Sequence, residues 1–193
     1  MKTYRSIAGM KRDQAHCRAC LETGHYLGSL PVIAPGEGQR AYMFGQAPGI
    51  VEGQERRPWR GRAGQTLRRW LAMDEDKFYA TFYCASVTRC YPGKPPSGRG
   101  DRTPTPEEQR LCSVWREHEL RLLQPKLIVT VGGLAARALI GAKSISECVG
   151  MRYDLDGAVV IPLPHPSGAS SWLNVPGNRA RVDAAVELIK SEL

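Results

Sequence analysis

Long apolar runs are absent from this sequence, and acidic residues and histidines are few. No stretch of its 193 residues approaches the roughly twenty consecutive apolar residues that cross a bilayer. Residues 1–16, MKTYRSIAGMKRDQAH, lack the apolar block of a signal peptide. We therefore expect a cytoplasmic protein with no membrane partner. Hydrophobic residues still make up 42% of the chain, which is enough to bury one sizeable core.

The shortage of acidic residues leaves a strongly basic chain. Nineteen Asp and Glu stand against 27 Lys and Arg, and the formal net charge is +8. Such an excess of positive charge favours a polyanionic partner. Nucleic acid is the leading candidate, although many basic proteins bind none.

The chain has six cysteines, and a reducing compartment disfavours a disulfide framework. Cys17 and Cys20 form a CxxC pair, whereas Cys90 and Cys112 stand alone. A pair plus two distant single cysteines is a set that can hold a four-thiolate zinc ion or an iron–sulfur cluster. The alternative is that Cys90 and Cys112 are small buried core residues.

The remaining cysteines and a second zinc pattern lead to no metal site. Residues 17–25, CRACLETGH, have the Cys, Cys and His spacing of a zinc knuckle, but Leu30 stands where its fourth ligand would be. Cys84 and Cys148 have no pairing pattern. We predict that both pack in the core.

Apolar periodicity predicts strands that alternate with helices. Strands are expected within residues 41–49, 77–90, 125–133 and 158–164, and helices within 63–73, 104–123, 134–141 and 178–193. The helix in 104–123 has a start signal, because Thr105 can cap it and Pro106 suits its first turn. Residues 92–106 are a loop by composition. The alternation predicts an α/β fold with a parallel sheet between layers of helices.

Three predicted loops follow strands of this sheet. They are GQAPG (residues 45–49), the loop after SVTRC (86–90) and HPSGAS (165–170). Ligands of such folds bind at the carboxyl ends of the strands. We therefore expect the three loops to converge on one cleft.

These loops and cysteines give the sequence a resemblance to the uracil-DNA glycosylase superfamily, and most closely to its iron–sulfur branch, family 4. Residues 45–67, GQAPGIVEGQERRPWRGRAGQTL, resemble that branch's first motif, GEAPG followed by a Glu and a PF-x-GRAGQ segment. SVTRCYP (86–92) resembles its NVVKCRP strand end, PTPEEQRLC (104–112) its PTPEE helix start, and HPSGAS its closing HPS motif. The matches cover most of the chain in the expected order.

The resemblance implies a three-layer α/β/α sandwich with a central four-stranded parallel sheet. Residues 1–193 would form a single domain with an N-terminal cluster-binding segment. All four cluster cysteines of the family are matched, which implies a [4Fe-4S] cluster, with zinc as the alternative. The matched residues are Cys17, Cys20, Cys90 and Cys112. The implied activity is that of a monofunctional DNA glycosylase, which hydrolyses the N-glycosidic bond of a base flipped out of DNA.

The resemblance also assigns candidate site residues. His165 would donate to the carbonyl of the departing base, Glu52 would position water, and Gln46 completes the catalytic set. The substrate-binding candidates are Gly45, Ala47, Pro48, Gly49, Trp59, Ser86 and Ser167. The DNA-binding candidates are Arg60, Arg62, Gly168, Ser170, Trp172 and Leu173. Trp172 and Leu173 could act as apolar wedges in the duplex. Further candidates for a phosphate-binding rim are Arg89, Arg99 and Arg102.

The sequence departs from the family pattern at three of these positions. Ser86 replaces the Asn that reads the uracil edge, and it offers one hydroxyl instead of an amide. Trp59 replaces the Phe on which the base stacks, and Gln46 replaces a Glu. In addition, GKPPSGRGD (residues 93–101) lengthens the loop between Cys90 and Cys112.

Two functions remain open from the sequence. The first is a glycosylase of base excision repair that removes uracil or another deaminated base from DNA. The second is a protein of the same fold that binds damaged DNA or abasic sites with weak or no cleavage. The presence of both Glu52 and His165 favours the enzyme. We expect a monomer.

Overall fold

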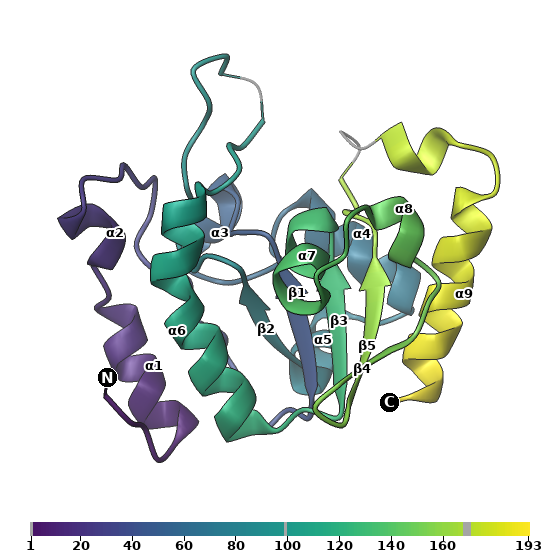
Figure 1. Cartoon of the computed structure of the whole chain (residues 1–193), viewed down its shortest axis with the longest axis horizontal. Helices are drawn as coiled ribbons and strands as arrows, with labels where there is room; N and C mark the ends of the chain where they lie inside the picture. The colour runs from purple at the N-terminus through teal and green to yellow at the C-terminus, as the bar shows by residue number, and fades with distance from the viewer. Residues whose placement is uncertain (1, 99, 168–170) are drawn as a thin grey trace.

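A five-stranded sheet lies at the centre of the computed structural model, which describes residues 2–98, 100–167 and 171–193 (Figure 1). The strands are β1 (Ala41–Gly45), β2 (Phe82–Ser86), β3 (Leu127–Val131), β4 (Tyr153–Leu155) and β5 (Ala158–Leu163). Their order is β2-β1-β3-β5-β4. In this order, neighbouring strands from β2 to β5 are parallel, and β4 pairs with β5 in the antiparallel direction. The predicted α/β fold is confirmed, with one strand more than the expected four.

The additional strand, β4, forms a hairpin with β5. Leu155 pairs with Ala158, so that Asp156 and Gly157 are the two loop residues. Both have positive φ, 52° and 81°, as the tight turns that suit a twisted hairpin require. The Asp-Gly pair in the sequence is itself a hairpin signal, and it identifies the strand that the apolar pattern missed.

Helices cover both faces of the sheet (Figure 1). They are α1 (Ile7–Ala15), α2 (Ala19–Glu22), α3 (Ile50–Glu55), α4 (Arg62–Leu71), α5 (Glu75–Thr81), α6 (Pro106–Leu123), α7 (Gly133–Ile140), α8 (Ile145–Cys148), α9 (Asn178–Ser191) and the 3-10 turn η1 (Ser171–Asn174). The N-terminal helices α1 and α2 lie beside α6, and α9 lies against β5 and α4. No helix in the described part of the chain is long and apolar enough to cross a membrane.

Alternate residues of the buried strands separate the core into two layers. On β1, Met43 packs against α4, α5 and α9, whereas Tyr42 and Phe44 pack against α1, α6 and α7. Such alternation follows from the two-residue period of a strand. Both faces are apolar, as expected for a parallel sheet between helices. Cys84 and Cys148 are buried at 3% and 1% exposure, which confirms that they are packing residues.

Two helix starts show how local signals compete with apolar periodicity. Thr105 caps α6 as predicted, because its hydroxyl accepts the Glu108 N–H at 3.2 Å and Glu108 accepts the Thr105 N–H at 2.7 Å. The strand predicted for residues 77–90 is wrong in its first part, where α5 precedes β2. Asp74 accepts the Lys77 N–H at 2.8 Å and starts that helix.

Candidate active site

A cleft of about 610 Å³ opens at the carboxyl ends of the parallel strands. It is lined by residues that follow β1, β2 and β5, and therefore the predicted convergence of three loops is confirmed. The predicted residues that line it are Gly45, Gln46, Ala47, Pro48, Gly49, Glu52, Trp59, Arg62, Ser86, His165 and Ser167. The end of the inserted loop, at Asp101 and Arg102, contributes a further wall.

Trp59 lies against the end of β1, in a loop that close contacts hold in place. Its φ of 60° is rare for a bulky side chain and costs of order 1–3 kcal/mol. The Trp59 carbonyl accepts a hydrogen bond from Arg68 at 2.9 Å. A Cβ on Gly64 would stand 1.8 Å from that carbonyl oxygen, and one on Gly45 would stand 2.8 Å from Cζ2 of the indole. Both glycines are therefore required for Trp59 to occupy its place in the cleft.

Glu52 joins two segments of the cleft. One carboxylate oxygen accepts the Gly49 N–H at 3.1 Å, and the other accepts the Gly61 N–H at 2.7 Å. The first bond caps α3, and the second ties that helix to the loop that carries Trp59. The carboxylate is thereby held at one position, with one lone pair of each oxygen already occupied.

His165 follows β5, and the next residues fix its ring. Nδ1 lies 2.9 Å from Ser167 Oγ and accepts the Ser167 N–H at 3.3 Å. Because an amide can donate only to an unprotonated nitrogen, this bond assigns the proton of the neutral ring to Nε2. Burial lowers the pKa of His165, against the opposite effect of the Asp101 and Glu52 charges. The ring is thus neutral at pH 7 and has Nε2–H as its donor.

Ser86 ends β2 opposite Gly45 of β1, and Gln46 follows β1 directly. Ser86 is 8% exposed, and its hydroxyl donates to the Thr88 carbonyl at 2.7 Å. With that hydrogen in use, the oxygen faces a ligand only as an acceptor. The main-chain carbonyl of Gln46 accepts the Thr88 N–H at 3.2 Å. This bond fixes the two strand ends to one another.

The four predicted ligand cysteines line one cavity beside α6. Burial, followed by neighbouring charges that include those of Cys112 and Cys17, raises the pKa of Cys20 to about 11, and the same two effects raise the pKa of Cys90. Thiols that disfavour one another's ionisation are held together as thiolates by a cation. The four cysteines therefore fit a shared metal centre.

In the described ranges, no group of three Cys, His, Asp or Glu residues is arranged to hold a single metal ion. Ligation by these four residues stays a prediction.

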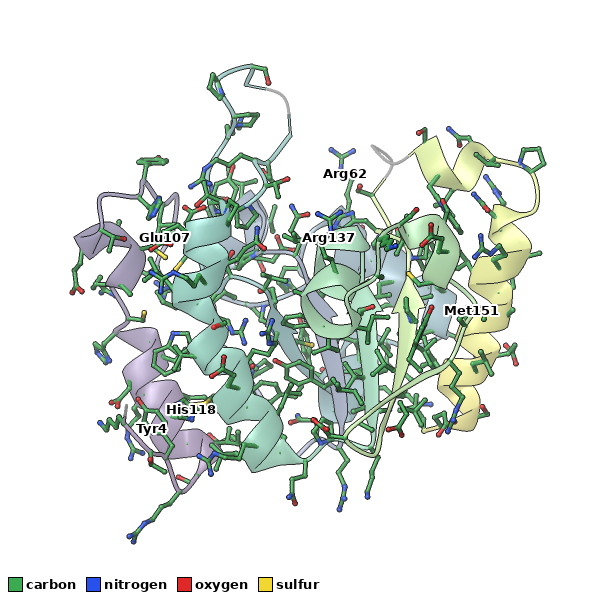
Figure 2. The ribbon with its side chains drawn as sticks, viewed as in Figure 1. Tyr4, Arg62, Glu107, His118, Arg137 and Met151 are labelled. Atoms are coloured by element: carbon green, nitrogen blue, oxygen red, sulfur yellow. The ribbon has the colours of Figure 1, made fainter. Side chains whose placement is uncertain are left out.

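Two of the DNA-binding candidates are arginines with different environments. Arg62 is exposed and projects from the upper edge of the molecule in Figure 2, and no carboxylate of the described residues pairs with it. Arg60 instead pairs with Glu55 at 2.5 Å and also with Glu75. A phosphate would have to compete with both carboxylates for Arg60, so the geometry favours Arg62.

The candidates near the C-terminus pack against the core. Trp172 donates its indole N–H to Ser146 at 2.8 Å, and both Trp172 and Leu173 contact the core layer that contains α9. Their role as a wedge in DNA stays a prediction. Gly168, Ser170 and Arg99 lie outside the described residues.

Arg89 does not belong to a phosphate-binding rim, and that prediction is wrong. It is 3% exposed, and its guanidinium lies 2.5 Å from Glu119. The main-chain N–H of Arg89 donates to Cys112 Sγ at 3.3 Å. Arg102 is half-buried and donates to both oxygens of Glu108, at 2.7 and 2.5 Å. These two arginines are bound to carboxylates of α6 and stabilise the fold.

Asp101 is a charged cleft residue that the sequence analysis did not single out. It ends the inserted segment and lines the cleft with Glu52 and His165. The only signal was its position directly after a Gly-rich insertion, which did not show where the loop would return. The structure brings it to the active-site side of the sheet.

Known proteins of similar sequence support the resemblance to uracil-DNA glycosylases. The model of the uracil DNA glycosylase superfamily matches residues 35–189. The type-4 uracil-DNA glycosylase of Thermotoga maritima is 34% identical over 141 residues, which are 70% of each chain. The type-4 enzyme of Sulfurisphaera tokodaii is 27% identical over 180 residues, 85% of this chain and 76% of its own. That of Pyrobaculum aerophilum is 31% identical over 128 residues, 65% and 59%.

The fold, the cleft and these relatives define a DNA glycosylase, a hydrolase of base–sugar bonds. The chain belongs to the uracil DNA glycosylase superfamily. The predicted similarity to family 4 is confirmed, since the three relatives are type-4 enzymes.

Proposed function

We propose that this protein removes uracil or another deaminated base from DNA, as the first step of base excision repair in the cytoplasm. The observation that carries the proposal is the neutral His165, whose Nδ1 accepts the Ser167 N–H and whose proton is therefore on Nε2. A donor fixed in this way can bind the carbonyl of a base as it leaves with negative charge. Such a donor needs no change of protonation during the reaction.

The reaction separates two opposite charges, and the cleft has a group for each. The base flips out of the duplex into the cleft. As the C1′–N bond breaks, its electron pair leaves with the base, which His165 Nε2–H stabilises. Glu52, held by Gly49 and Gly61, supplies negative charge against the cationic sugar and keeps lone pairs for water. Gln46, which follows β1, adds an amide to the cleft.

Recognition of the base follows from the walls of the cleft. Trp59 supplies a flat apolar surface on which a base stacks. Ser86 presents an acceptor, since its hydrogen is bound to Thr88. Uracil, hypoxanthine and xanthine each have a ring N–H beside a carbonyl, and such an N–H can donate to Ser86. Residues 45–49 bring main-chain groups to the same space.

Binding to DNA is proposed to rest on Arg62 and on the main chain around Ser167, with the protein acting as a monomer. Cys17, Cys20, Cys90 and Cys112 would hold a [4Fe-4S] cluster, which would cross-link the N-terminal segment, the segment after β2 and α6. The Arg89 N–H on Cys112 Sγ supports such a centre, because hydrogen bonds to sulfur stabilise bound thiolates.

The test is release of free base from oligonucleotides that carry uracil, hypoxanthine or xanthine, single-stranded and opposite each normal base. We expect release from at least one of them, and loss of that release in His165→Ala. Ser86→Asn, which restores an amide, is expected to increase the preference for uracil. An iron-loaded wild-type protein that releases no base, but binds abasic DNA, would refute the proposal in favour of a damage-binding protein.

A further inference from the structure

The cleft contains a second carboxylate, at the end of the inserted loop. Asp101 Oδ2 lies 3.2 Å from the point at which a Cβ on Gly49 would stand, and Glu52 Oε2 lies 2.8 Å from the same point. The two carboxylates therefore flank the start of α3. Both line the cleft with His165.

The two carboxylates differ in how they are held. Glu52 has one backbone amide on each oxygen. Asp101 is exposed, and no backbone amide among the described residues donates to its side chain. Its neighbour is Tyr91, whose pKa is raised to about 12, first by burial and then by hydrogen bonding to Asp101. Tyr91 thus takes up part of the Asp101 carboxylate, and the other lone pairs are available to water because Asp101 is exposed.

The inserted loop is built to keep Asp101 in place. The Arg102 N–H donates to the Gly93 carbonyl at 3.0 Å, which closes the stem of the loop directly after Asp101. The Arg102 side chain binds Glu108 through two hydrogen bonds and donates to the Tyr26 carbonyl at 2.9 Å. The residue next to Asp101 is therefore anchored to α6 and to the N-terminal segment.

Asp101 is also electrostatically close to the proposed base donor. Burial is the largest influence on the pKa of His165, and the charge of Asp101 opposes it more strongly than that of Glu52 does. Asp101 and His165 line the same cleft, so a water bound to Asp101 would lie in the space that the flipped nucleotide enters.

From this geometry we infer that Asp101 is a catalytic residue that binds the attacking water and accepts its proton. The inference rests on the proposed function. The C1′–N bond breaks and its electron pair leaves with the base. The water oxygen then bonds to C1′, and its proton passes to Asp101 and from there to solvent. Glu52 holds the loop, supplies fixed charge and can share the water through its remaining lone pairs, whereas Asp101 takes the proton, so the two carboxylates have separate tasks.

The test compares Asp101→Asn with Glu107→Gln, which makes the same change in net charge. Glu107 lies in the first turn of α6 and pairs with Arg110, on the α2 side of that helix in Figure 2. Base release is measured under single-turnover conditions, with the best substrate of the wild type. Thermal unfolding of each variant checks the fold.

Asp101→Asn is expected to slow base release by about 100-fold or more, as for loss of a general base. Glu107→Gln should keep the rate of the wild type. A rate of Asp101→Asn within about threefold of the wild type overturns the role of Asp101. A wild type that releases no base overturns the proposed function, and the role of Asp101 with it.

Discussion

Replacement of Glu119 by glutamine tests how a buried ion pair supports both the sheet and the cysteine cavity. Arg89 and Glu119 are 3% and 1% exposed, with Nη2 and Oε2 2.5 Å apart. The Glu119 carboxylate also accepts hydrogen bonds from the Tyr42 hydroxyl and from Gln14 Nε2. Glutamine keeps the shape and one acceptor, and it leaves the Arg89 charge buried without its counter-charge.

The expected loss is large. Breaking a buried ion pair by removing one partner costs about 3–5 kcal/mol. In a chain of this length each kcal/mol corresponds to about 2–4 °C, so Tm should fall by about 6–20 °C. Because the Arg89 N–H donates to Cys112, the iron content of the purified protein should fall as well.

The assay is thermal and urea unfolding of the wild type, Glu119→Gln, Arg89→Met and the double variant. Since the double variant removes the unpaired charge, its loss should be smaller than the sum of the single losses by about 2 kcal/mol. Glu187→Gln is the matched control, because the Glu187–Lys190 pair is exposed and worth about 0.5 kcal/mol. Additive losses, or a Glu119→Gln loss no larger than that of the control, would refute the reasoning.

Three further predictions concern the site. Gly64→Ala should lower the free energy of unfolding by about 1–3 kcal/mol and slow base release, because its Cβ would stand 1.8 Å from the Trp59 carbonyl oxygen. A variant that unfolds at the same urea concentration as the wild type and releases base at the same rate would contradict this. Cys112→Ala should remove iron and the brown colour, as elemental analysis and visible absorbance would show, whereas full iron content would exclude Cys112 as a ligand. The folded pKa of His165 is lowered from 6.5, so its contribution to stability is complete above pH 6.5 and is lost as pH falls through the folded pKa. Urea unfolding should therefore depend more steeply on pH in the wild type than in His165→Ala, and parallel pH profiles would contradict this.

Local signals predicted much of the fold. The cap at Thr105 and the apolar strands over residues 125–133 and 158–164 correspond to α6, β3 and β5. The short helix α5 was missed because Phe78, Tyr79 and Thr81 are residue types that favour strands, and the cap at Asp74 decides the outcome. The strand β4 was missed because it is short and little buried, although Asp156 and Gly157 signal its turn.

The site was predictable where it depends on strand order and not where it depends on side-chain partners. The convergence of the loops after β1, β2 and β5 follows from parallel topology. The environment of Arg89 does not, because its partner Glu119 is thirty positions away and its burial is a tertiary property. Asp101 was missed for the same reason, since the return of a long loop to the cleft is set by the Arg102–Glu108 contact.

The most direct test of the account is the single-turnover rate of free-base release by wild type and His165→Ala, with DNA binding measured in parallel. If the Nε2–H donor stabilises the departing base, the variant should be slower by about 10²–10³-fold, the usual loss for one such donor, with nearly unchanged affinity for the oligonucleotide. Equal rates for the two proteins would contradict the central claim.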